Sequence, residues 1–220
     1  MHNPGDLPIG STSSPFSQEM LAPLQRLAYS FFEESTATVA QKLLGNLVVR
    51  SIKGHLLIGK IVETESYTFG DPASHCYQNK TIRNQALFGP TGHAYIYTIY
   101  GIHYGFNVVA YNEQDQAGGV LIRAIEPLVG INHMQEYRQK TGYCLTNGPG
   151  KLTQAFNIDT QFYAYGLIQG SELFLAEPIE KETFTLQATP RIGISKAQDH
   201  KGRFFITGNP WITPHRFNKL

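Results

Sequence analysis

A seven-residue segment, Ile61–Tyr67, carries two carboxylates and a tyrosine at every second position. Since successive side chains of a strand point to opposite faces, Glu63, Glu65 and Tyr67 share one face of the predicted strand. The apolar run Leu56–Val62 leads into this acidic face, which indicates a strand that ends at a cleft. An edge strand with a solvated face is the alternative that the carboxylate pair by itself leaves open.

The composition is that of a soluble globular protein. A chain of 220 residues can form one large domain that buries roughly 70% of its unfolded surface, and no apolar run approaches the roughly 20 residues of a membrane span. Two distant cysteines, Cys76 and Cys144, predict neither a disulfide framework nor a zinc site. We expect a monomer without metal or cofactor. The first residues lack a secretory signal, which indicates a cytoplasmic protein, associated with the nucleoid if bacterial.

The predicted elements mix strands with a few helices and show no internal repeat. Residues 1–23 are rich in Pro, Ser and Gly and are predicted to form a flexible extension, which leaves residues 24–220 as one domain. An arginine, Arg123, interrupts an apolar strand and requires an anionic partner or a water-filled pocket. Helices are predicted at residues 37–44, 128–140 and after 147–150, and strands at residues 47–51, up to 67, 92–107 as a hairpin, 120–125, 173–175 and 204–206.

Charge alone does not identify a partner. The formal net charge is +1, whereas nucleic-acid-binding domains usually carry a clear basic excess. Between Arg191 and Leu220, six Lys and Arg residues stand against one Asp, so six minus one gives this stretch a charge of +5. Such a stretch either faces an acidic partner or is simply solvated, and both interpretations remain open.

Tyrosines are concentrated in the predicted hairpin. Tyr95, Tyr97, Tyr100 and Tyr104 lie within ten residues of one another, beside the turn at Tyr100-Gly101. Tyrosines at alternate strand positions usually pack across strands. Stacking on nucleic-acid bases is the other interpretation, and the surrounding motifs favour it.

Ten short motifs follow one another from about Ser35 to Trp211. They are Leu43-Leu-Gly45, Ile61-Val-Glu-Thr-Glu-x-Tyr67, Asp71-x-Ala-x-His75, Arg83-Asn84, Tyr95-x-Tyr-x-x-Tyr-Gly101, Asn107, Val120-Leu-Ile-Arg-Ala-Ile-Glu-Pro127, Asn147-Gly-Pro-Gly-Lys-Leu152, Arg191-Ile-Gly193 and Gly208-Asn-Pro-Trp211. In this combination and order the chain resembles the alkyladenine (3-methyladenine or 3-methylpurine) DNA glycosylase family. A single E-T-E-x-Y motif would be weak support, but ten motifs in the family's order are specific.

The resemblance implies a mixed α/β (α+β) single domain, in which helices flank a curved, largely antiparallel sheet and a β-hairpin protrudes. Residues 24–220 would be the catalytic domain of a monofunctional glycosylase of base-excision repair. Its partner would be double-stranded DNA that contains damaged purines of the 3-methyladenine, 7-methylguanine, hypoxanthine or ethenoadenine class. The enzyme would flip such a purine out of the duplex, hydrolyse its N-glycosidic bond and leave an abasic site.

The resemblance also implies three residues for the reaction. Glu65 matches the carboxylate that activates a water molecule and stabilises the cation-like sugar of the transition state. Arg123 matches an arginine that helps to hold this water, and the backbone of Ile192 matches a further water contact. Taken alone, Arg123 would be interpreted as an ion-pair partner of Glu63 or Glu126.

The other implied residues bind DNA. Tyr67 matches the stacking partner of one face of the flipped purine, and His75 and Tyr97 match the partners of the other face. The remaining matches are Asn107 for exclusion of the guanine amino group, Tyr100 for intercalation into the vacated stack, and Lys151 for a phosphate contact. Two departures from the family pattern are a histidine at position 103, where relatives carry an aromatic residue, and the loop Gln78–Ala86.

Two other functions remain open at this point. An inverting glycoside hydrolase would use Glu63 and Glu65 as its carboxylate pair, because residues two apart in a strand are separated by roughly 7 Å. A non-catalytic nucleic-acid-binding module of similar fold would not require Glu65 at all. We interpret Glu63 as structural, and the basic C-terminal stretch and the tyrosine at the hairpin turn favour the glycosylase.

Overall fold

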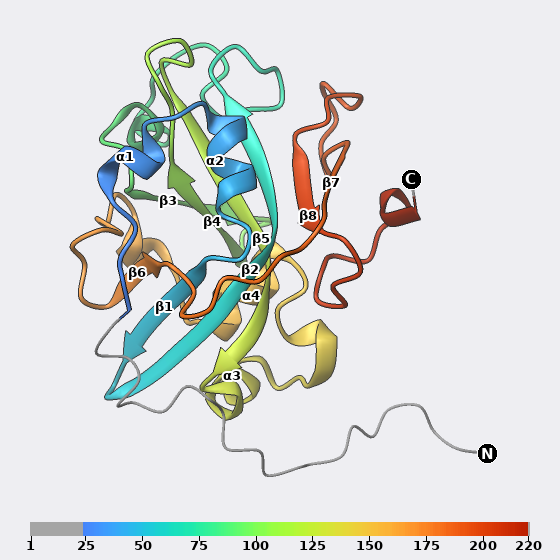
Figure 1. Ribbon diagram of the computed structural model, residues 1–220. Coiled ribbons are helices and arrows are strands. Elements are labelled where there is room, and N and C mark those ends of the chain that lie inside the picture. Colours follow the sequence, from blue (N-terminus) through green and yellow to red (C-terminus); the bar gives the residue numbers. More distant parts are fainter. Residues whose placement is uncertain (1–23, 220) are drawn as a thin grey trace.

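The computed structural model describes residues 24–219, so the extension predicted for residues 1–23 lies outside the described residues. One eight-stranded antiparallel sheet curves through the molecule, with short helices beside it (Figure 1). The predicted single domain of mixed class with a curved antiparallel sheet is therefore confirmed, with more strand than helix. The strands are β1 Leu47–Ile52, β2 His55–Thr68, β3 Ala94–Ile99, β4 His103–Val109, β5 Gly118–Val129, β6 Leu173–Ala176, β7 Leu186–Thr189 and β8 Arg203–Ile206.

The helices are short. The α-helices are α1 Tyr29–Phe32, α2 Thr36–Lys42, α3 Ile131–Arg138 and α4 Pro149–Ala155, and the 3-10 helices are η2 Gln85–Phe88, η3 Gly142–Leu145, η4 Thr160–Phe162 and η5 Arg216–Lys219. The N-cap of α2 is Ser35, whose side chain accepts a hydrogen bond from the Thr38 amide, because the first amides of a helix lack partners within it. No helix in the described part of the chain is long and apolar enough to cross a membrane.

Strand β2 is the central strand of the sheet, which runs in the order β3-β4-β5-β2-β1-β6. One edge of β2 pairs with β5 along most of its length, and the other edge pairs first with β1 and then, at Glu63–Glu65, with β8. The pairing with β5 shifts register near Gly59 and on both sides of Glu63. A Cβ atom at Gly59 would lie 2.1 Å from the Ile125 side chain, so this position requires glycine. Because β2 is paired on both edges, the alternative of an edge strand with a solvated face is excluded.

The two faces of β2 serve different purposes. The Thr64 hydroxyl donates a hydrogen bond of 2.7 Å to the Ala40 carbonyl of α2, which covers one face of the sheet at this point. The main hydrophobic core lies between this face and α2 and includes Val39 and Ile122. Glu63 and Glu65 point to the opposite face, as the alternation of the sequence predicts.

Two predicted elements differ from the structure. The helix predicted for residues 128–140 is wrong at its start, because β5 continues to Val129 and pairs there with Ile58. Gly130, with a φ of 76°, turns the chain from β5 into α3, which ends at Arg138. Strand β7 was not predicted, since its sequence Leu-Gln-Ala-Thr has no clear apolar alternation and it is held by pairing with β8.

The hairpin of β3 and β4 ends in the predicted turn. Tyr100 and Gly101 have φ values of 49° and 76°, the signs that a type I′ turn requires at its two central positions. The side chain of Tyr100 is 91% exposed, and that of Ile102 is 75% exposed. Two large apolar side chains therefore stand in solvent at the tip of a hairpin whose strands are otherwise packed.

Candidate active site

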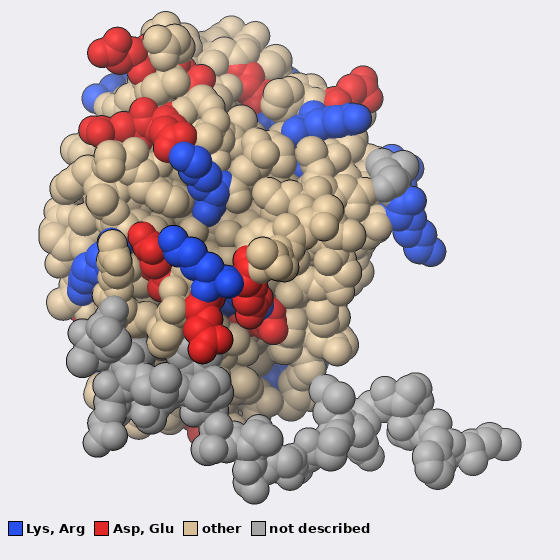
Figure 2. All heavy atoms as spheres, viewed as in Figure 1, with Lys and Arg blue, Asp and Glu red and all other residues tan. Residues whose placement is uncertain are grey.

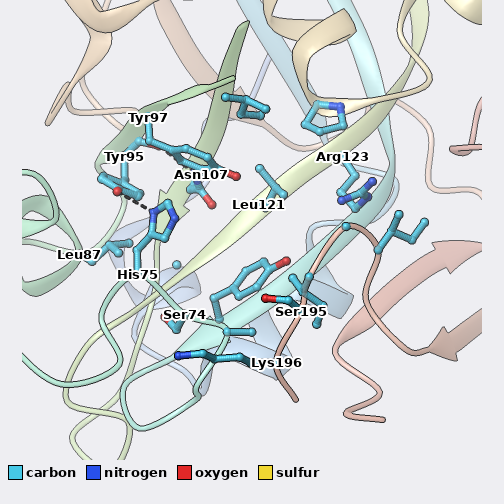
Figure 3. Close-up of a pocket in the computed structure, with 18 of the residues that line it drawn as sticks. Ser74, His75, Leu87, Tyr95, Tyr97, Asn107, Leu121, Arg123, Ser195 and Lys196 are labelled. Carbon is cyan, nitrogen blue, oxygen red and sulfur yellow. Dashed lines mark hydrogen bonds between the residues drawn. The ribbon is translucent and has the colours of Figure 1, made fainter. Parts of the chain in front are cut away.

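A pocket of about 580 Å³ opens where β3, β4 and β5 meet the loop that follows β2. The loop between β7 and β8 closes another side, and from it Ser195 and Lys196 reach the rim (Figure 3). Aromatic, amide and arginine side chains converge on this space from four different elements. The predicted residues that line it are Tyr67, His75, Tyr97, Tyr100, Asn107, Arg123 and Ile192.

One wall consists of Tyr95, Tyr97 and His75 (Figure 3). The His75 ring lies edge-on to Tyr97, with 4.6 Å between ring centroids, and His75 Nδ1 lies 2.9 Å from the Tyr95 hydroxyl. Burial, together with the charge of Arg83, lowers the pKa of His75 below its ordinary value. This wall is therefore aromatic and uncharged at neutral pH.

Tyr67 lies at the end of β2 and also lines the pocket. Its hydroxyl donates a hydrogen bond of 2.7 Å to Glu65 Oε2, and the Arg191 guanidinium lies 4.6 Å from its ring centroid. Burial and the neighbouring Glu65 charge raise the pKa of Tyr67 well above its ordinary value. The hydroxyl thus remains a proton donor to the carboxylate, while Arg191 holds the ring through a cation–π contact.

Glu65 is fully buried and does not itself line the pocket, and its carboxylate accepts three hydrogen bonds. Oε2 accepts from the Tyr67 hydroxyl and from Arg123 Nη1 at 3.0 Å, and Oε1 accepts from the Ile192 amide at 2.7 Å. All three donor residues line the pocket. Because an ionised carboxylate has about four acceptor positions, one position on Oε1 remains for a further donor.

Arg123 lies between the two carboxylates of β2. Its Nε donates to Glu63 Oε1 at 3.1 Å, and its Nη1 donates to Glu65. Burial alone would lower the pKa of Arg123, but the two carboxylates outweigh it and raise that pKa. The arginine that interrupts the apolar strand thus has anionic partners and also faces a pocket, and Glu126 instead pairs with Lys60.

Glu63 is equally buried but is bonded to other elements. Its Oε1 also accepts from Arg203 Nε at 2.7 Å, and its Oε2 accepts from the Thr213 amide at 2.6 Å. Neither Arg203 nor Thr213 lines the pocket. The interpretation of Glu63 as a structural residue agrees with these contacts.

Asn107 and Lys151 lie at different depths. Asn107 on β4 is buried, lines the pocket and donates a hydrogen bond of 3.0 Å to the Tyr95 carbonyl. Lys151 in α4 does not line the pocket, and its Nζ donates to Asn147 Oδ1 at 2.7 Å. The start of α4 lies close to the turn end of the hairpin, since a Cβ atom at Gly150 would lie 2.9 Å from His103, the first residue of β4.

The basic C-terminal stretch is less exposed than its composition implies. Arg191 and Arg203 are buried, and they pair with Asp71 and Glu63. The basic residues that remain solvated are Lys196, Lys201, Arg216 and Lys219. On the face shown in Figure 2, most of the surface is uncharged, and acidic and basic side chains lie beside one another where charges occur. Neither interpretation of this stretch, an acid-facing surface or a solvated one, applies to the two buried arginines, and both stay open for the four exposed cations.

Arg191 joins three parts of the site that sequence reasoning did not connect. It donates to the Ser66 carbonyl at 2.9 Å and to both carboxylate oxygens of Asp71, in the loop that leads to His75. Burial alone would raise the pKa of Asp71, but the hydrogen bonds from Arg191 lower it. The motifs that contain Asp71 and Arg191 were recognisable in the sequence. Their pairing was not, because the two residues lie 120 positions apart in the chain.

Residues 24–219 contain no group of three or more His, Cys, Asp or Glu side chains placed to hold an ion. The groups at and beside the pocket are a buried carboxylate with an open acceptor position, a fixed guanidinium and aromatic walls. Such a set can position and deprotonate a water molecule beside a planar ligand.

Comparisons with known proteins identify the family of this chain. The family model for methylpurine-DNA glycosylase matches residues 30–210. Proteins named "Putative 3-methyladenine DNA glycosylase" are similar over most of the chain: that of Carboxydothermus hydrogenoformans is 43% identical over 88% of this chain and 99% of its own length. Those of Chlorobaculum tepidum and Methanoculleus marisnigri are each 42% identical, over 86% and 85% of this chain and 91% and 98% of their own lengths. The chain therefore belongs to the methylpurine-DNA glycosylase family.

Proposed function

We propose that this protein is a monofunctional DNA glycosylase of base-excision repair. It binds double-stranded DNA as a monomer, flips an alkylated or deaminated purine into the pocket and hydrolyses the N-glycosidic bond, which leaves an abasic site. Residues 24–220 act as the catalytic domain. The substrate class comprises 3-methyladenine, 7-methylguanine, hypoxanthine and ethenoadenine, and no cofactor takes part.

The observation that carries this proposal is the setting of Glu65. Its carboxylate is held by three donors that all line the pocket, and Oε1 keeps one free acceptor position. A water molecule bound there would lie between the carboxylate and a ligand in the pocket. Glu65 would accept its proton as it attacks C1′ of the sugar, and the negative charge would stabilise the cation-like sugar.

Arg123 and Ile192 would position this water. Arg123 uses two of its five N–H donors for the carboxylates of β2, so other donors are free to face the pocket. The Ile192 amide is already bound to Glu65, so we assign the water contact to the Ile192 carbonyl. Both groups hold the nucleophile in place rather than exchange protons, because the raised pKa of Arg123 keeps it charged.

The walls of the pocket suit a planar base. A flipped purine would stack on Tyr67 on one side and on His75 and Tyr97 on the other, and the pocket volume of about 580 Å³ falls within the usual range for ligand sites. An uncharged His75 is compatible with purines that carry a positive charge after alkylation. Asn107 would contact the edge of the base and exclude the amino group of guanine.

The hairpin and α4 would hold the duplex. Tyr100, exposed at the tip and also lining the mouth of the pocket, would fill the stack that the flipped base leaves. Lys151 would contact a phosphate, which contributes mainly affinity and salt dependence. Its present acceptor, Asn147, is neutral, so the lysine charge is available to DNA.

An inverting glycoside hydrolase is less well supported. Such an enzyme needs two carboxylates that flank one substrate bond, whereas Glu63 is bound to Arg203 and Thr213, neither of which lines the pocket. A non-catalytic DNA-binding module would not require the free acceptor position of Glu65. It would bind the duplex but release no base, which distinguishes it from a glycosylase.

The test measures base release from duplexes that hold one damaged purine, with enzyme in excess, for wild type and Glu65→Gln. We expect wild type to release the base without strand cleavage, and Glu65→Gln to reduce the rate by about 10²- to 10⁴-fold while it still binds the lesion duplex. Glu126→Gln is the matched control, because Glu126 pairs with Lys60 outside the pocket. Equal rates for wild type and Glu65→Gln would contradict the mechanism, and no release by wild type would contradict the proposed function.

A further inference from the structure

Four buried charges of alternating sign form a continuous chain that ends at Glu65. Arg203 Nε lies 2.7 Å from Glu63 Oε1, Arg123 Nε lies 3.1 Å from the same oxygen, and Arg123 Nη1 lies 3.0 Å from Glu65 Oε2. All four side chains belong to the buried class. The order Arg203–Glu63–Arg123–Glu65 runs from the interior of the sheet to the floor of the pocket.

The chain is neutral as a whole, with two carboxylates and two guanidinium groups. In a buried environment each charge requires a partner, and the loss of one partner leaves another charge uncompensated. Without Arg203, Arg123 would be the sole ion-pair partner of Glu63 and Glu65 among residues 24–219. The attraction that fixes Arg123 beside Glu65 would then be divided between two carboxylates.

Arg203 is anchored on the side away from the pocket. Its Nη1 donates to Thr189 Oγ1 at 3.1 Å and its Nη2 to Asn218 Oδ1 at 2.9 Å. The Thr213 amide binds the other oxygen of Glu63. Asn218 and Thr213 follow the range 30–210 that the family model matches, so the C-terminal segment of this chain completes the anchor.

We propose that Arg203 is a positioning residue for base release. It neutralises Glu63, so that the charge of Arg123 acts on Glu65 and on the water beside it, although Arg203 touches neither the pocket nor its ligand. This inference rests on the proposed function of Glu65 as the residue that activates water.

The first variant is Arg203→Met, which removes the charge and keeps an apolar side chain. Arg123 is then drawn toward Glu63, and displacement of a positioned group by about 1 Å reduces a rate by about 10²-fold. We expect base release at saturating enzyme to slow by about this factor, whereas the affinity for the lesion duplex stays close to that of wild type because the aromatic walls, Tyr67, His75 and Tyr97, are unchanged. An unchanged release rate in the folded variant would overturn the proposal.

The second variant adds Glu63→Gln to Arg203→Met. It removes the uncompensated carboxylate and restores a one-to-one pair between Arg123 and Glu65, while the glutamine oxygen can still accept from Arg123 Nε. We expect the double variant to release bases faster than Arg203→Met alone, which is a non-additive result. If Arg203 merely supported the fold, the double variant would release bases no faster than Arg203→Met alone. That outcome would overturn the proposal.

Arg50→Met is the matched control for a lost buried arginine. Arg50 is 2% exposed, pairs with Glu172 and contacts the β1 backbone, and it does not line the pocket. We expect this variant to be less stable in urea but to release bases at the rate of wild type. If it slows release as much as Arg203→Met does, the effect is one of general stability and the proposal fails.

A readout independent of activity separates this inference from the proposed function. The Nε–H signal of Arg123 in the nitrogen–proton NMR spectrum is identified by its loss in Arg123→Lys. We expect Arg203→Met to shift this signal and to speed its hydrogen exchange, the double variant to reverse part of the change, and Arg50→Met to have no effect. An Arg123 signal that Arg203→Met leaves unchanged would overturn the proposal, even if the wild-type protein releases purines as expected.

Discussion

Glu63 and Glu65 lie two residues apart on the same face of β2, and both are fully buried with three hydrogen bonds to each carboxylate. They differ in where their partners lie. The donors to Glu65 all line the pocket, whereas two of the three donors to Glu63 lie on β8 and in the C-terminal segment. Burial and hydrogen bonding therefore do not distinguish a structural carboxylate from a candidate catalytic one, but the position of its partners does.

The comparison also explains why one strand can carry both residues. Between the two carboxylates, Thr64 points to the other face and binds α2, so β2 is fixed independently of the charges. Register shifts in the pairing with β5 occur on both sides of Glu63, and β8 begins to pair with β2 at the same point. At Glu63, the partner of β2 on this edge thus changes from β1 to β8. At the same point the pair Arg203–Glu63 adjoins the pair Arg123–Glu65, whose arginine lines the pocket.

The largest expected effect is a difference in base-release rate between variants of the two carboxylates. We expect Glu65→Gln to slow base release by about 10³-fold and Glu63→Gln to slow it far less, because only Glu65 has an acceptor position at the pocket. Single-turnover assays on one duplex with 7-methylguanine measure both rates. Similar losses in the two variants would remove the distinction on which this comparison depends.

For the free energy of unfolding we expect the reverse order, with a larger loss in Glu63→Gln than in Glu65→Gln. Glu63→Gln leaves the buried Arg203 without its anion, and removal of one partner of a buried pair costs about 3–5 kcal/mol. Glu65→Gln leaves Arg123 with Glu63 as its anion, so we expect a smaller loss. Urea unfolding monitored by circular dichroism gives both free energies of unfolding, and a greater loss for Glu65→Gln would contradict the assignment of Glu63.

Tyr67→Phe tests the donor that links the pocket wall to Glu65. The variant keeps the stacking ring but removes the hydrogen bond of 2.7 Å to Oε2. A hydrogen bond to a charged group contributes about 1.5–3 kcal/mol, so we expect release to slow by about 10- to 100-fold with little change in duplex affinity. Tyr163→Phe, at a tyrosine outside the pocket lining, is the control and should leave the release rate unchanged.

Tyr100→Ser tests the hairpin tip, which should affect DNA and not the fold. Since the side chain is 91% exposed, we expect the free energy of unfolding to remain the same. Stacking of one aromatic residue on a base contributes about 1–3 kcal/mol, so lesion duplex binding should weaken by that amount. Gel-shift titrations on lesion and undamaged duplexes check this expectation, and equal weakening on both would argue against insertion into the stack.

The smallest expected effect is a pH dependence from His75. Because its pKa lies below the ordinary 6.5, the ring is neutral at pH 7 and gains a proton only as the pH falls below that value. A positive charge would then lie beside a cationic purine, so release of 7-methylguanine should slow on acidification and His75→Phe should lose this part of the profile. The same sign holds for stability: the contribution present above pH 6.5 is lost on acidification. An unchanged acidic limb in His75→Phe would contradict the role of this ring.

Much of the fold follows from local patterns. Alternation in Ile61–Tyr67 predicted the shared face of Glu63, Glu65 and Tyr67, and the aromatic hairpin with its turn at Tyr100 is confirmed. The start of α3 was mispredicted because the apolar residues Leu128 and Val129 fit a helix as well as a strand. Only their pairing with β2, which is a long-range contact, decides between the two.

The site was predictable in part. The motifs named Glu65, Tyr67, His75 and Arg123. The structure places Tyr67, His75 and Arg123 in the lining of one pocket, and the buried Glu65 is bonded to two of them, although their roles stay predictions. The pairing of Arg203 with Glu63 was not predicted, since it joins residues 140 apart. An arginine at the start of an apolar run, Phe204–Ile206, was the available signal, and it is the same signal that marked Arg123.

The most direct test of the central claim is a crystal structure of the protein bound to a duplex that carries a non-cleavable ethenoadenine nucleotide. We expect the base between Tyr67 and Tyr97 and an ordered water within hydrogen-bond distance of Glu65 Oε1 and about 3–3.5 Å from C1′ of the sugar, as attack requires. A Glu65 carboxylate whose fourth acceptor position is filled by protein, or a modified base that stays stacked in the duplex, would contradict the claim that Glu65 activates water beside a flipped purine.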